Sequence, residues 1–589
     1  MRTIRNPRQT RLFDPFDPVL TERTRQALLE DWQGVFRHVL LELMPVEVLG
    51  GAFDPSIGRP TKELYSMAGL LVIKAFMDWT EEEAVTAYRF HLDVHYALNL
   101  NPKAQDLSVR TLERYARLFV DHDLAGRVMH EVTTTLVREC GLRIDQQRLD
   151  STHVFSDMAS FGRTRMMGVT VKRFLTQLKR HDRPAYEGLD EALRQRYAPS
   201  VHKLFGGRGQ DEASRRLLRQ QVAEDLYELI RRFADHPEHA QRPTYKMLEQ
   251  VFHEQCVVRE EQVTLKSKTG GNVVQNPSDP DATYDGHKGP GYQVQIAETC
   301  HLDNEVQLVT AALPQTAVAS DTAALPKVLD ELEGDQLLPE SLLADALYGS
   351  DDNVLEAASR GVELVAPTKE GARQAEADQA AADQAAAAPD PLSLDDFAID
   401  DAAETVQWCP AGHAPQGSVF DPSRGKTTTT MPVAACSQCP SFDRCPVRAV
   451  RGVYRLEHTA KQRRLADRRG EEQTDAFRDR YRRRAGIEGT NSGVKRRTGL
   501  GRLRVRGQTR VFSEMLLRLA GWNILRAAAC STLRERVAER AHEALGRVLF
   551  GRFLAPMRHF ALPPAIGQLL RHRSVPGPIF SHSRQPVAA

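Results

Sequence analysis

Apolar residues recur at helical spacing through the first 140 residues. The segment LYSMAGLLVIKAFMD (64–78) combines helix-forming residues with a wide apolar face, which predicts a buried helix. Thr80 and Glu83 have the spacing of a capping box and predict the start of a second helix. Ser108 is a candidate N-cap for an amphipathic helix over residues 108–122. We therefore expect residues 1–140 to form an all-helical domain.

The helix over residues 108–122 carries Arg110 and Arg114 on its polar side. Short helices whose last member bears arginines suit a helix-turn-helix-like module that reads the major groove of DNA. A plain helical bundle has the same apolar spacing. The pattern alone leaves both interpretations open.

Beyond residue 141 the hydrophobic period changes toward two, which is typical of strands. Helical patterns separate the later strands, so the order indicates a mixed α/β sheet. The strands are expected within residues 142–154, 292–300, 306–313, 341–349 and 361–369, and the helices within 322–333 and 350–361.

Residues 155–276 interrupt this sheet between its first and second strands. The segment is charged and mostly helical, as in DLYELIRRFADH. An insertion of this kind can grip DNA or a second subunit, or it can be a solvated helical hairpin. The insertion lies within a first part of the core that we place at residues 141–370.

The second half of the chain changes composition several times. Residues 371–404 are rich in Ala, Asp and Gln, which is typical of a low-complexity linker. A small cysteine-bearing insertion is expected at 405–450 and the last part of the core at 451–530. Residues 531–589 are expected to form a C-terminal helical tail with a disordered end.

The distribution of charge says more than its total. The formal net charge of the whole chain is +1, whereas residues 479–510 hold ten Arg and one Lys against one Asp and one Glu. Local concentration of basic residues is the electrostatic footprint of a nucleic-acid binder. We therefore expect DNA as the partner.

The chain shows no export or membrane signal. The N-terminus has Arg residues but no apolar core of a signal peptide, and the longest apolar stretch, near residues 68–76, is too short to span a bilayer. Four of the eight Cys crowd into residues 409–445, unlike a disulfide framework. These features predict a reduced, cytoplasmic protein with no membrane partner.

One segment stands out for its spacing. Tyr481, Arg484, Glu488 and Lys495 follow the order Tyr-x2-Arg-x3-Glu-x6-Lys. In one continuous helix, these offsets would place all four side chains on the same face. One carboxylate among cations suits a metal-binding acid beside a phosphodiester, although a solvated basic helix has a similar composition.

This spacing resembles the signature of the DDE transposases of bacterial insertion sequences that carry a Tyr-Arg-Glu-Lys motif. Two further segments match in the expected order, RLDSTHV with Asp150 and LLADALYGS with Asp345. The resemblance runs from about residue 45 to about residue 526. It implies a ribonuclease-H-like catalytic domain, an N-terminal helical domain that binds DNA, and at least a homodimer on DNA.

The resemblance also assigns roles. Asp150, Asp345 and Glu488 would coordinate two Mg²⁺ or Mn²⁺ ions, which prefer oxygen ligands. Water would cleave the phosphodiester at the element end, and the freed 3′-hydroxyl would attack target DNA. Five residues would hold DNA phosphates, namely Tyr481, Arg484, Lys495, Arg496 and Arg497. Three more would extend this grip, namely Arg502, Arg504 and Arg506. Asp145 and Asp351 lie near the two aspartates but do not occupy the matching positions.

The cysteine cluster predicts a structural zinc site. Cys409, Cys436, Cys439 and Cys445 include a Cys-x2-Cys pair, and four soft ligands fit a closed tetrahedral Zn²⁺ site. His413 could replace one cysteine. The alternative is four reduced thiols without a metal.

Three functions fit these features. The first is a transposase that cleaves and joins DNA with Mg²⁺. The second is a catalytically inactive, domesticated transposase that only binds DNA, and the presence of all three acids argues against it. The third is a zinc-bearing nuclease of the same fold that hydrolyses DNA but does not join it.

Overall fold

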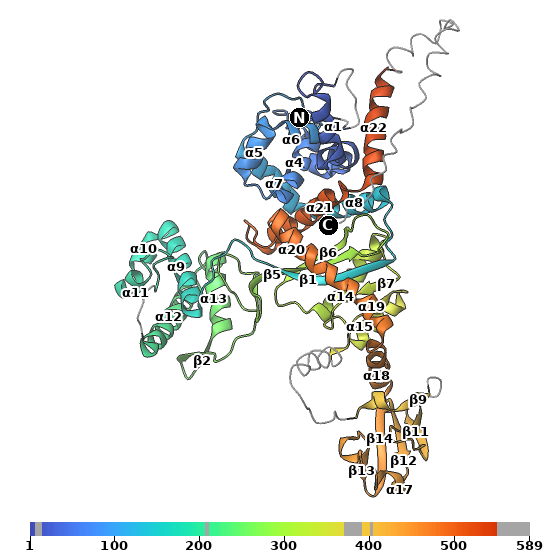
Figure 1. The fold of residues 1–589 in the computed structure, drawn as a ribbon. Coiled ribbons are helices and arrows are strands. Elements are labelled where there is room, and N and C mark those ends of the chain that lie inside the picture. Colours follow the sequence, from blue (N-terminus) through green and yellow to red (C-terminus); the bar gives the residue numbers. More distant parts are fainter. Residues whose placement is uncertain (6, 8–13, 206–210, 370–391, 401–404, 550–589) are drawn as a thin grey trace, which may run out of the picture.

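In the computed structural model, the part of the chain before residue 141 is helical (Figure 1). The structure describes residues 1–589 except 6, 8–13, 206–210, 370–391, 401–404 and 550–589. The two helices predicted around residues 64–78 and 108–122 are confirmed, and Thr80 and Glu83 form the predicted capping box. The helical elements of this part are α1 (Glu22–Glu30), α2 (Trp32–Val35), η1 (Phe36–Leu40), η2 (Leu41–Leu43), α3 (Val46–Gly51), α4 (Leu64–Phe76), α5 (Glu81–Phe90), α6 (Leu92–Ala97), α7 (Val109–Asp121) and α8 (Leu124–Cys140).

A mixed α/β sheet follows, as the alternation of patterns predicts. Its order is β6–β5–β1–β7–β8, and β4 pairs with the beginning of β5. β1 runs antiparallel to β5 and parallel to β7, so the sheet changes from antiparallel to parallel at β1. Its elements are β1 (Gln146–Val154), β4 (Thr283–Asp285), β5 (Gly289–Thr299), β6 (Val309–Thr316), α14 (Asp321–Gly334), β7 (Ser341–Leu343), α15 (Asp351–Ser359) and β8 (Glu363–Val365).

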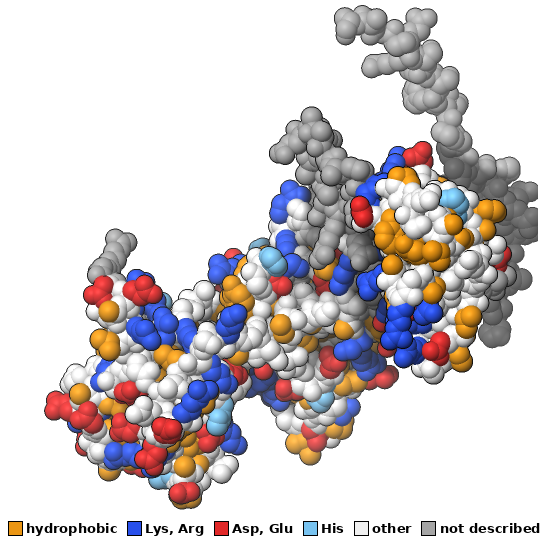
Figure 2. All heavy atoms as spheres, turned by 90° about the horizontal axis from the view of Figure 1, so that it is seen from below, with side chains coloured by type: hydrophobic (Ala, Val, Ile, Leu, Met, Phe, Trp, Pro, Cys, Tyr) orange, Lys and Arg blue, Asp and Glu red, His pale blue; other side chains and the backbone are white. Residues whose placement is uncertain are grey.

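Between β1 and β4 the chain forms a lobe with its own hydrophobic core, which projects to the left in Figure 1. Its surface in Figure 2 carries Asp and Glu side chains among its Lys and Arg side chains. It contains a β-hairpin besides the expected helices. Its elements are α9 (Arg163–His181), α10 (Arg183–Glu187), α11 (Glu191–Arg196), α12 (Glu212–Phe233), α13 (Pro243–Gln255), β2 (Cys256–Arg259) and β3 (Gln262–Leu265).

A small β lobe carries the cysteine cluster at the lower end of Figure 1. The expected linker at 371–404 lies mostly outside the described residues. The elements of this lobe are η3 (Leu394–Asp396), β9 (Ala398–Asp400), β10 (Thr405–Trp408), β11 (Gly417–Asp421), β12 (Lys426–Met431), α17 (Val433–Cys436), η4 (Phe442–Arg444), β13 (Arg448–Val450) and β14 (Val453–Thr459).

Helices return to the main body after this lobe. They are α18 (Ala460–Glu472), α19 (Asp475–Tyr481), η5 (Arg482–Ala485), α20 (Gly486–Thr498), α21 (Gln508–Ala527) and α22 (Ser531–Leu549). The predicted disordered end of the tail lies outside the described residues. Among the helices that the structure describes, none is both long and apolar enough to cross a membrane.

Helix α21 joins the N-terminal helices to the sheet. Asn523, fully buried, exchanges two hydrogen bonds with the backbone of Val309 on β6 and donates to Thr133 on α8. Gly521 allows close approach, because a Cβ there would lie 2.1 Å from the Cβ of Phe76 on α4. The N-terminal helices and the sheet therefore share one hydrophobic core.

Candidate functional site

Asp150 lies on β1, and Asp345 lies just beyond the end of the neighbouring strand β7. The parallel register pairs Gln146 with Ser341 and Arg148 with Leu343, so the same offset places Asp150 level with Asp345. Asp345 is the second residue after the end of β7, and its Oδ1 accepts a hydrogen bond from the backbone N–H of Leu347 at 2.8 Å. The longer β1 continues past this point and carries Asp150. Both acids thus stand at the carboxyl end of β7, where an open α/β sheet usually binds ligands.

Helix α20 brings the third acid to the same place. Glu488 lies in its first turn, and its side chain is 70% exposed. One turn later, Asn491 donates a hydrogen bond from Nδ2 to Oδ2 of Asp150 at 3.1 Å. Sequence reasoning missed Asn491, although its position three residues after Glu488 places it on the same helix face.

Arg484 contacts all three acids. Its Nη2 lies 3.3 Å from Oδ1 of Asp150 and 3.8 Å from Oδ2 of Asp345, and its Nη1 lies 3.6 Å from Oε1 of Glu488. The three carboxylates predicted from separate segments therefore surround one cation. The resemblance assigned Arg484 to DNA phosphate, whereas in this structure it faces the acids.

Burial and the neighbouring charges together raise the pKa of Asp150. Burial raises the pKa of Asp150, the guanidinium of Arg484 opposes this rise, and the carboxylate of Asp345 adds to it. A fourth acid, Asp321 at the start of α14, adds a smaller rise and accepts a hydrogen bond from Ser151 at 3.3 Å. Negative charge is therefore concentrated here beyond what one guanidinium neutralises.

The predicted single helix over the Tyr-Arg-Glu-Lys motif is wrong in detail. α19 ends at Tyr481, and a short 3₁₀ turn, η5, precedes α20. In this turn the carbonyl of Arg483 accepts a hydrogen bond from the backbone N–H of Gly486 and another from Nη1 of Arg148 at 3.1 Å. Residues three apart eclipse in a 3₁₀ turn, so Tyr481 and Arg484 still share a side. Tyr481 stacks on Phe477 with ring centroids 5.6 Å apart.

A buried ion pair fastens α20 to the sheet. Glu298 on β5, 1% exposed, accepts hydrogen bonds from Arg148 at 2.8 Å and from Thr490 at 2.7 Å. Because Thr490 is only two residues after Glu488, the ion pair of Arg148 and Glu298 also helps to position Glu488. Sequence reasoning did not single out Glu298 or Arg148, because the pairing depends on the register between β1 and β5.

The basic residues divide into two groups. Lys495 is half-buried near Asp150; burial lowers its pKa, Lys288 adds to the fall and Asp150 opposes it. Arg496 and Arg497 are exposed on α20. By contrast, Arg504 donates to Asp78 and Arg506 to Asp157, so these two side chains have partners within the chain.

The donor set of the three acids suits hard divalent ions, which take carboxylate oxygens. Arg484, lying within 4 Å of all three, shows that the pocket accepts positive charge. Asp145 and Asp351 are engaged elsewhere, in ion pairs with Arg143 and Arg464.

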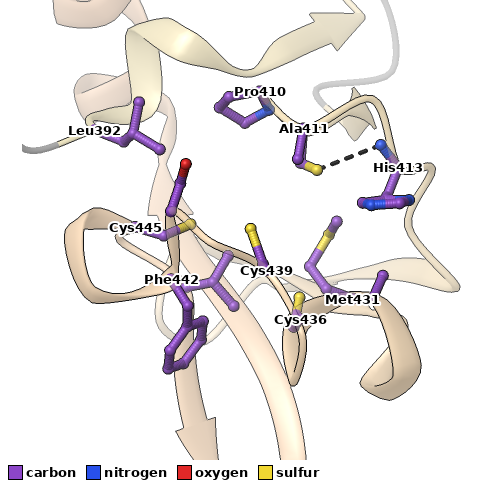
Figure 3. Close-up of a pocket in the computed structure, with 13 residues that line it drawn as sticks. Leu392, Pro410, Ala411, His413, Met431, Cys436, Cys439, Phe442 and Cys445 are labelled. Atoms are coloured by element: carbon purple, nitrogen blue, oxygen red, sulfur yellow. Dashed lines mark hydrogen bonds between the residues drawn. The ribbon is translucent and has the colours of Figure 1, made fainter.

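The four cysteines of the small lobe line one cavity of about 20 Å³, together with His413 (Figure 3). The Sγ of Cys409 accepts a hydrogen bond from the backbone N–H of His413 at 3.4 Å. No three of the four sulfur atoms, all in described residues, lie within 4.8 Å of one another. Zn–S bonds of about 2.3 Å need sulfurs about 3.8 Å apart. The ligand types therefore fit zinc, but their present spacing does not support it.

Another group with metal-ligating atoms lies in the helical lobe. One ligand atom each from Asp182, His236 and His239 lies within 4.8 Å of the others. His239 is hydrogen-bonded to Asp182 at 3.0 Å, and Nδ1 of His236 accepts from the backbone of Glu238 and His239. These bonds use one ring nitrogen of each histidine, and Nδ1 of His239 is buried without a hydrogen-bond partner in the described part of the chain.

Comparison with known proteins gives one match. No curated protein and no solved structure matches the chain. Residues 408–528 match the family described as transposase DDE domain. The match spans the cysteine cluster, Glu488 and α21, whereas Asp150 and Asp345 lie outside it. This match, on a mixed α/β fold, supports a DDE transposase, a DNA-processing enzyme whose family uses divalent metals.

Proposed function

We propose that this protein is the transposase of a bacterial insertion sequence, which cleaves DNA at the element ends and joins them to target DNA. The observation that carries the proposal is the convergence of Asp150, Asp345 and Glu488 on one cation. These acids come from β1, from the segment after β7 and from α20, which are far apart in the sequence. The sheet order β6–β5–β1–β7–β8 supports the ribonuclease-H-like interpretation of the fold.

The three carboxylates would hold two Mg²⁺ or Mn²⁺ ions, which would supply charge neutralisation and an activated nucleophile. Glu488 reaches them from the exposed side of α20, where DNA can approach. Asn491 fixes the orientation of Asp150 through its hydrogen bond.

Lys495, Arg496 and Arg497 would hold the phosphates on either side of the cut. Phosphate contacts of this kind position DNA without reading its sequence. In the first step, a water oxygen bonds to phosphorus and the 3′-oxygen leaves as a hydroxyl. In the second step, the oxygen of that hydroxyl bonds to the phosphorus of a target phosphodiester, and the 3′-oxygen of the target strand leaves in line as a hydroxyl.

Recognition of the element end would fall to the N-terminal helices. On α7, Leu112, Tyr115 and Phe119 are buried, while Arg110 and Arg114 are exposed. An exposed arginine face on an anchored helix suits contacts in a DNA groove. Because these helices share the core with the sheet, Arg110→Ala and Arg114→Ala test this role better than a truncation does.

The decisive experiment incubates the purified chain with DNA that flanks its coding region, with and without Mg²⁺. The proposal expects Mg²⁺-dependent cleavage near the element end, followed by joining to a second DNA. Cleavage without joining would favour a nuclease. Binding without cleavage would favour a domesticated DNA-binding protein.

A structural Zn²⁺ at Cys409, Cys436, Cys439 and Cys445 is a separate proposal. It requires the sulfurs to move closer than they lie here. Metal analysis of protein purified without chelator should find one zinc per chain, and none in a variant carrying Cys436→Ser and Cys439→Ser. A wild-type chain without zinc would leave the cluster as four reduced thiols.

A further inference from the structure

The guanidinium of Arg484 occupies the centre of the acidic site but is held loosely. Its three carboxylate contacts measure 3.3, 3.6 and 3.8 Å, longer than the roughly 2.7–2.9 Å of a charge-assisted hydrogen bond. Its Nε is buried and has no hydrogen-bond partner among the described residues. By comparison, Arg148 grips Glu298 at 2.6 and 2.8 Å. Arg484 is therefore retained by charge and not by a fixed set of hydrogen bonds.

The position of Arg484 would bring its positive charge close to a metal ion bound by the same carboxylates. Three carboxylates carry a charge of about −3, of which Arg484 neutralises one unit. A divalent ion bound to these oxygens would lie within a few ångströms of the guanidinium, where like charges repel strongly in a partly buried site. The side chain of Arg484 is 17% exposed, so it has a path toward solvent on the side where Glu488 is open.

We propose that Arg484 is an internal counter-cation that competes with divalent metal ions for Asp150, Asp345 and Glu488. In the metal-free chain it holds the three carboxylates together against their mutual repulsion. When metal binds, the guanidinium leaves the oxygens and faces the solvent side, where a DNA phosphate can take it. This inference rests on the proposed function of the site. It adds that metal binding would release Arg484 from the carboxylates before the guanidinium meets a DNA phosphate.

Competition predicts how substitutions change metal affinity. Arg484→Gln removes the competitor and should bind Mn²⁺ about tenfold more tightly, within the range usual for coupling between two ligands. Arg484→Lys keeps the charge but contacts fewer carboxylates. Its affinity for Mn²⁺ should therefore lie between those of wild type and Arg484→Gln. Arg482→Gln is the matched control, because Arg482 is exposed and pairs only with Asp479 in the described structure.

The experiment titrates the full chain with Mn²⁺ in the absence of DNA and measures free Mn²⁺ by electron paramagnetic resonance. Glu488→Gln identifies the part of the binding that belongs to this site, apart from other groups such as that of Asp182. Unfolding temperatures in EDTA and in excess Ca²⁺ give a second measurement. Arg484→Gln should be several degrees less stable than wild type in EDTA, and the gap should close in Ca²⁺.

The outcomes separate the two proposals. Tighter Mn²⁺ binding by Arg484→Gln, or a variant that folds only with Ca²⁺, supports competition. Binding that is equal to or weaker than wild type in both Arg484 variants overturns it, while the proposed function stands. If Glu488→Gln binds Mn²⁺ as wild type does, the carboxylates are not the metal site, and the proposed function fails with the inference.

Discussion

The buried pair of Arg148 and Glu298 allows a quantitative test of how α20 is positioned. Arg148→Met keeps most of the side-chain volume but removes the guanidinium. Glu298 would then remain 1% exposed with Thr490 as its remaining side-chain hydrogen-bond partner in the described structure. Breaking a buried pair in this way usually costs about 3–5 kcal/mol, because one charge is left uncompensated.

The cost should depend on pH. Burial raises the pKa of Glu298, and Arg148 is the largest influence opposing the rise. Between the ordinary value of about 4.3 and the raised pKa, the folded chain binds more protons than the unfolded chain, so stability falls as pH rises. Without Arg148 the pKa should rise further. The deficit of Arg148→Met should therefore be largest near pH 7.5 and smaller near pH 5.

Denaturant unfolding at both pH values measures the deficit, with the fluorescence of Trp522 on α21, next to α20, as the local probe. The double variant Arg148→Met with Glu298→Gln is the control, since it removes both charges and should recover much of the loss. A deficit below about 1 kcal/mol, or one that does not change with pH, would refute the view that this pair is a buried electrostatic brace.

Two further substitutions test close approaches around the site. Gly486→Ala would place a Cβ 1.9 Å from Nη1 of Arg148. The variant should therefore have a lower unfolding temperature than wild type, although alanine favours helices. An unchanged or higher unfolding temperature would show that Arg148 moves freely. Gly349→Ala would place a Cβ 2.2 Å from the backbone oxygen of Pro367, so it should destabilise the chain by about 1–3 kcal/mol and disturb the turn after Asp345. Denaturant unfolding of this variant beside Gly286→Ala checks the steric part, because a Cβ at Gly286 meets no atom within 4 Å and neither glycine has a positive φ.

Much of the fold could be predicted from the sequence because its signals are local. The caps at Thr80 and Ser108 begin helices as expected, and the alternating segment around Tyr292 and Val294 is a strand. The strand at 341–349 is shorter than expected, because the chain turns after Leu343. That turn is what leaves Asp345 at the open edge.

The features that could not be predicted from the sequence depend on contacts between distant segments of the chain. The sequence predicts that Arg504 and Arg506 bind DNA. In the folded chain, however, Arg504 pairs with Asp78 and Arg506 pairs with Asp157. The 3₁₀ turn before Gly486 is hydrogen-bonded to Arg148, more than three hundred residues earlier in the chain. No local pattern carries such information, since it follows from how α20 packs against β1.

The three acids, by contrast, could be singled out from the sequence because each belongs to a short ordered motif. Their convergence on Arg484 could not be predicted, because it needs the register of β1 with β7 and the docking of α20. Residues that only support the site, such as Asn491 and Glu298, have no motif of their own.

The most direct test of the central claim measures DNA cleavage and DNA binding by Glu488→Gln beside Arg482→Gln. Glu488 is an exposed carboxylate whose charge, in this account, serves metal binding and not DNA phosphate. Its loss should reduce Mg²⁺-dependent cleavage at the element end by at least about a hundredfold while DNA affinity stays within a few-fold of wild type. The Arg482→Gln control should cleave nearly as well as wild type. Wild-type cleavage by Glu488→Gln would contradict the assignment of the acidic site.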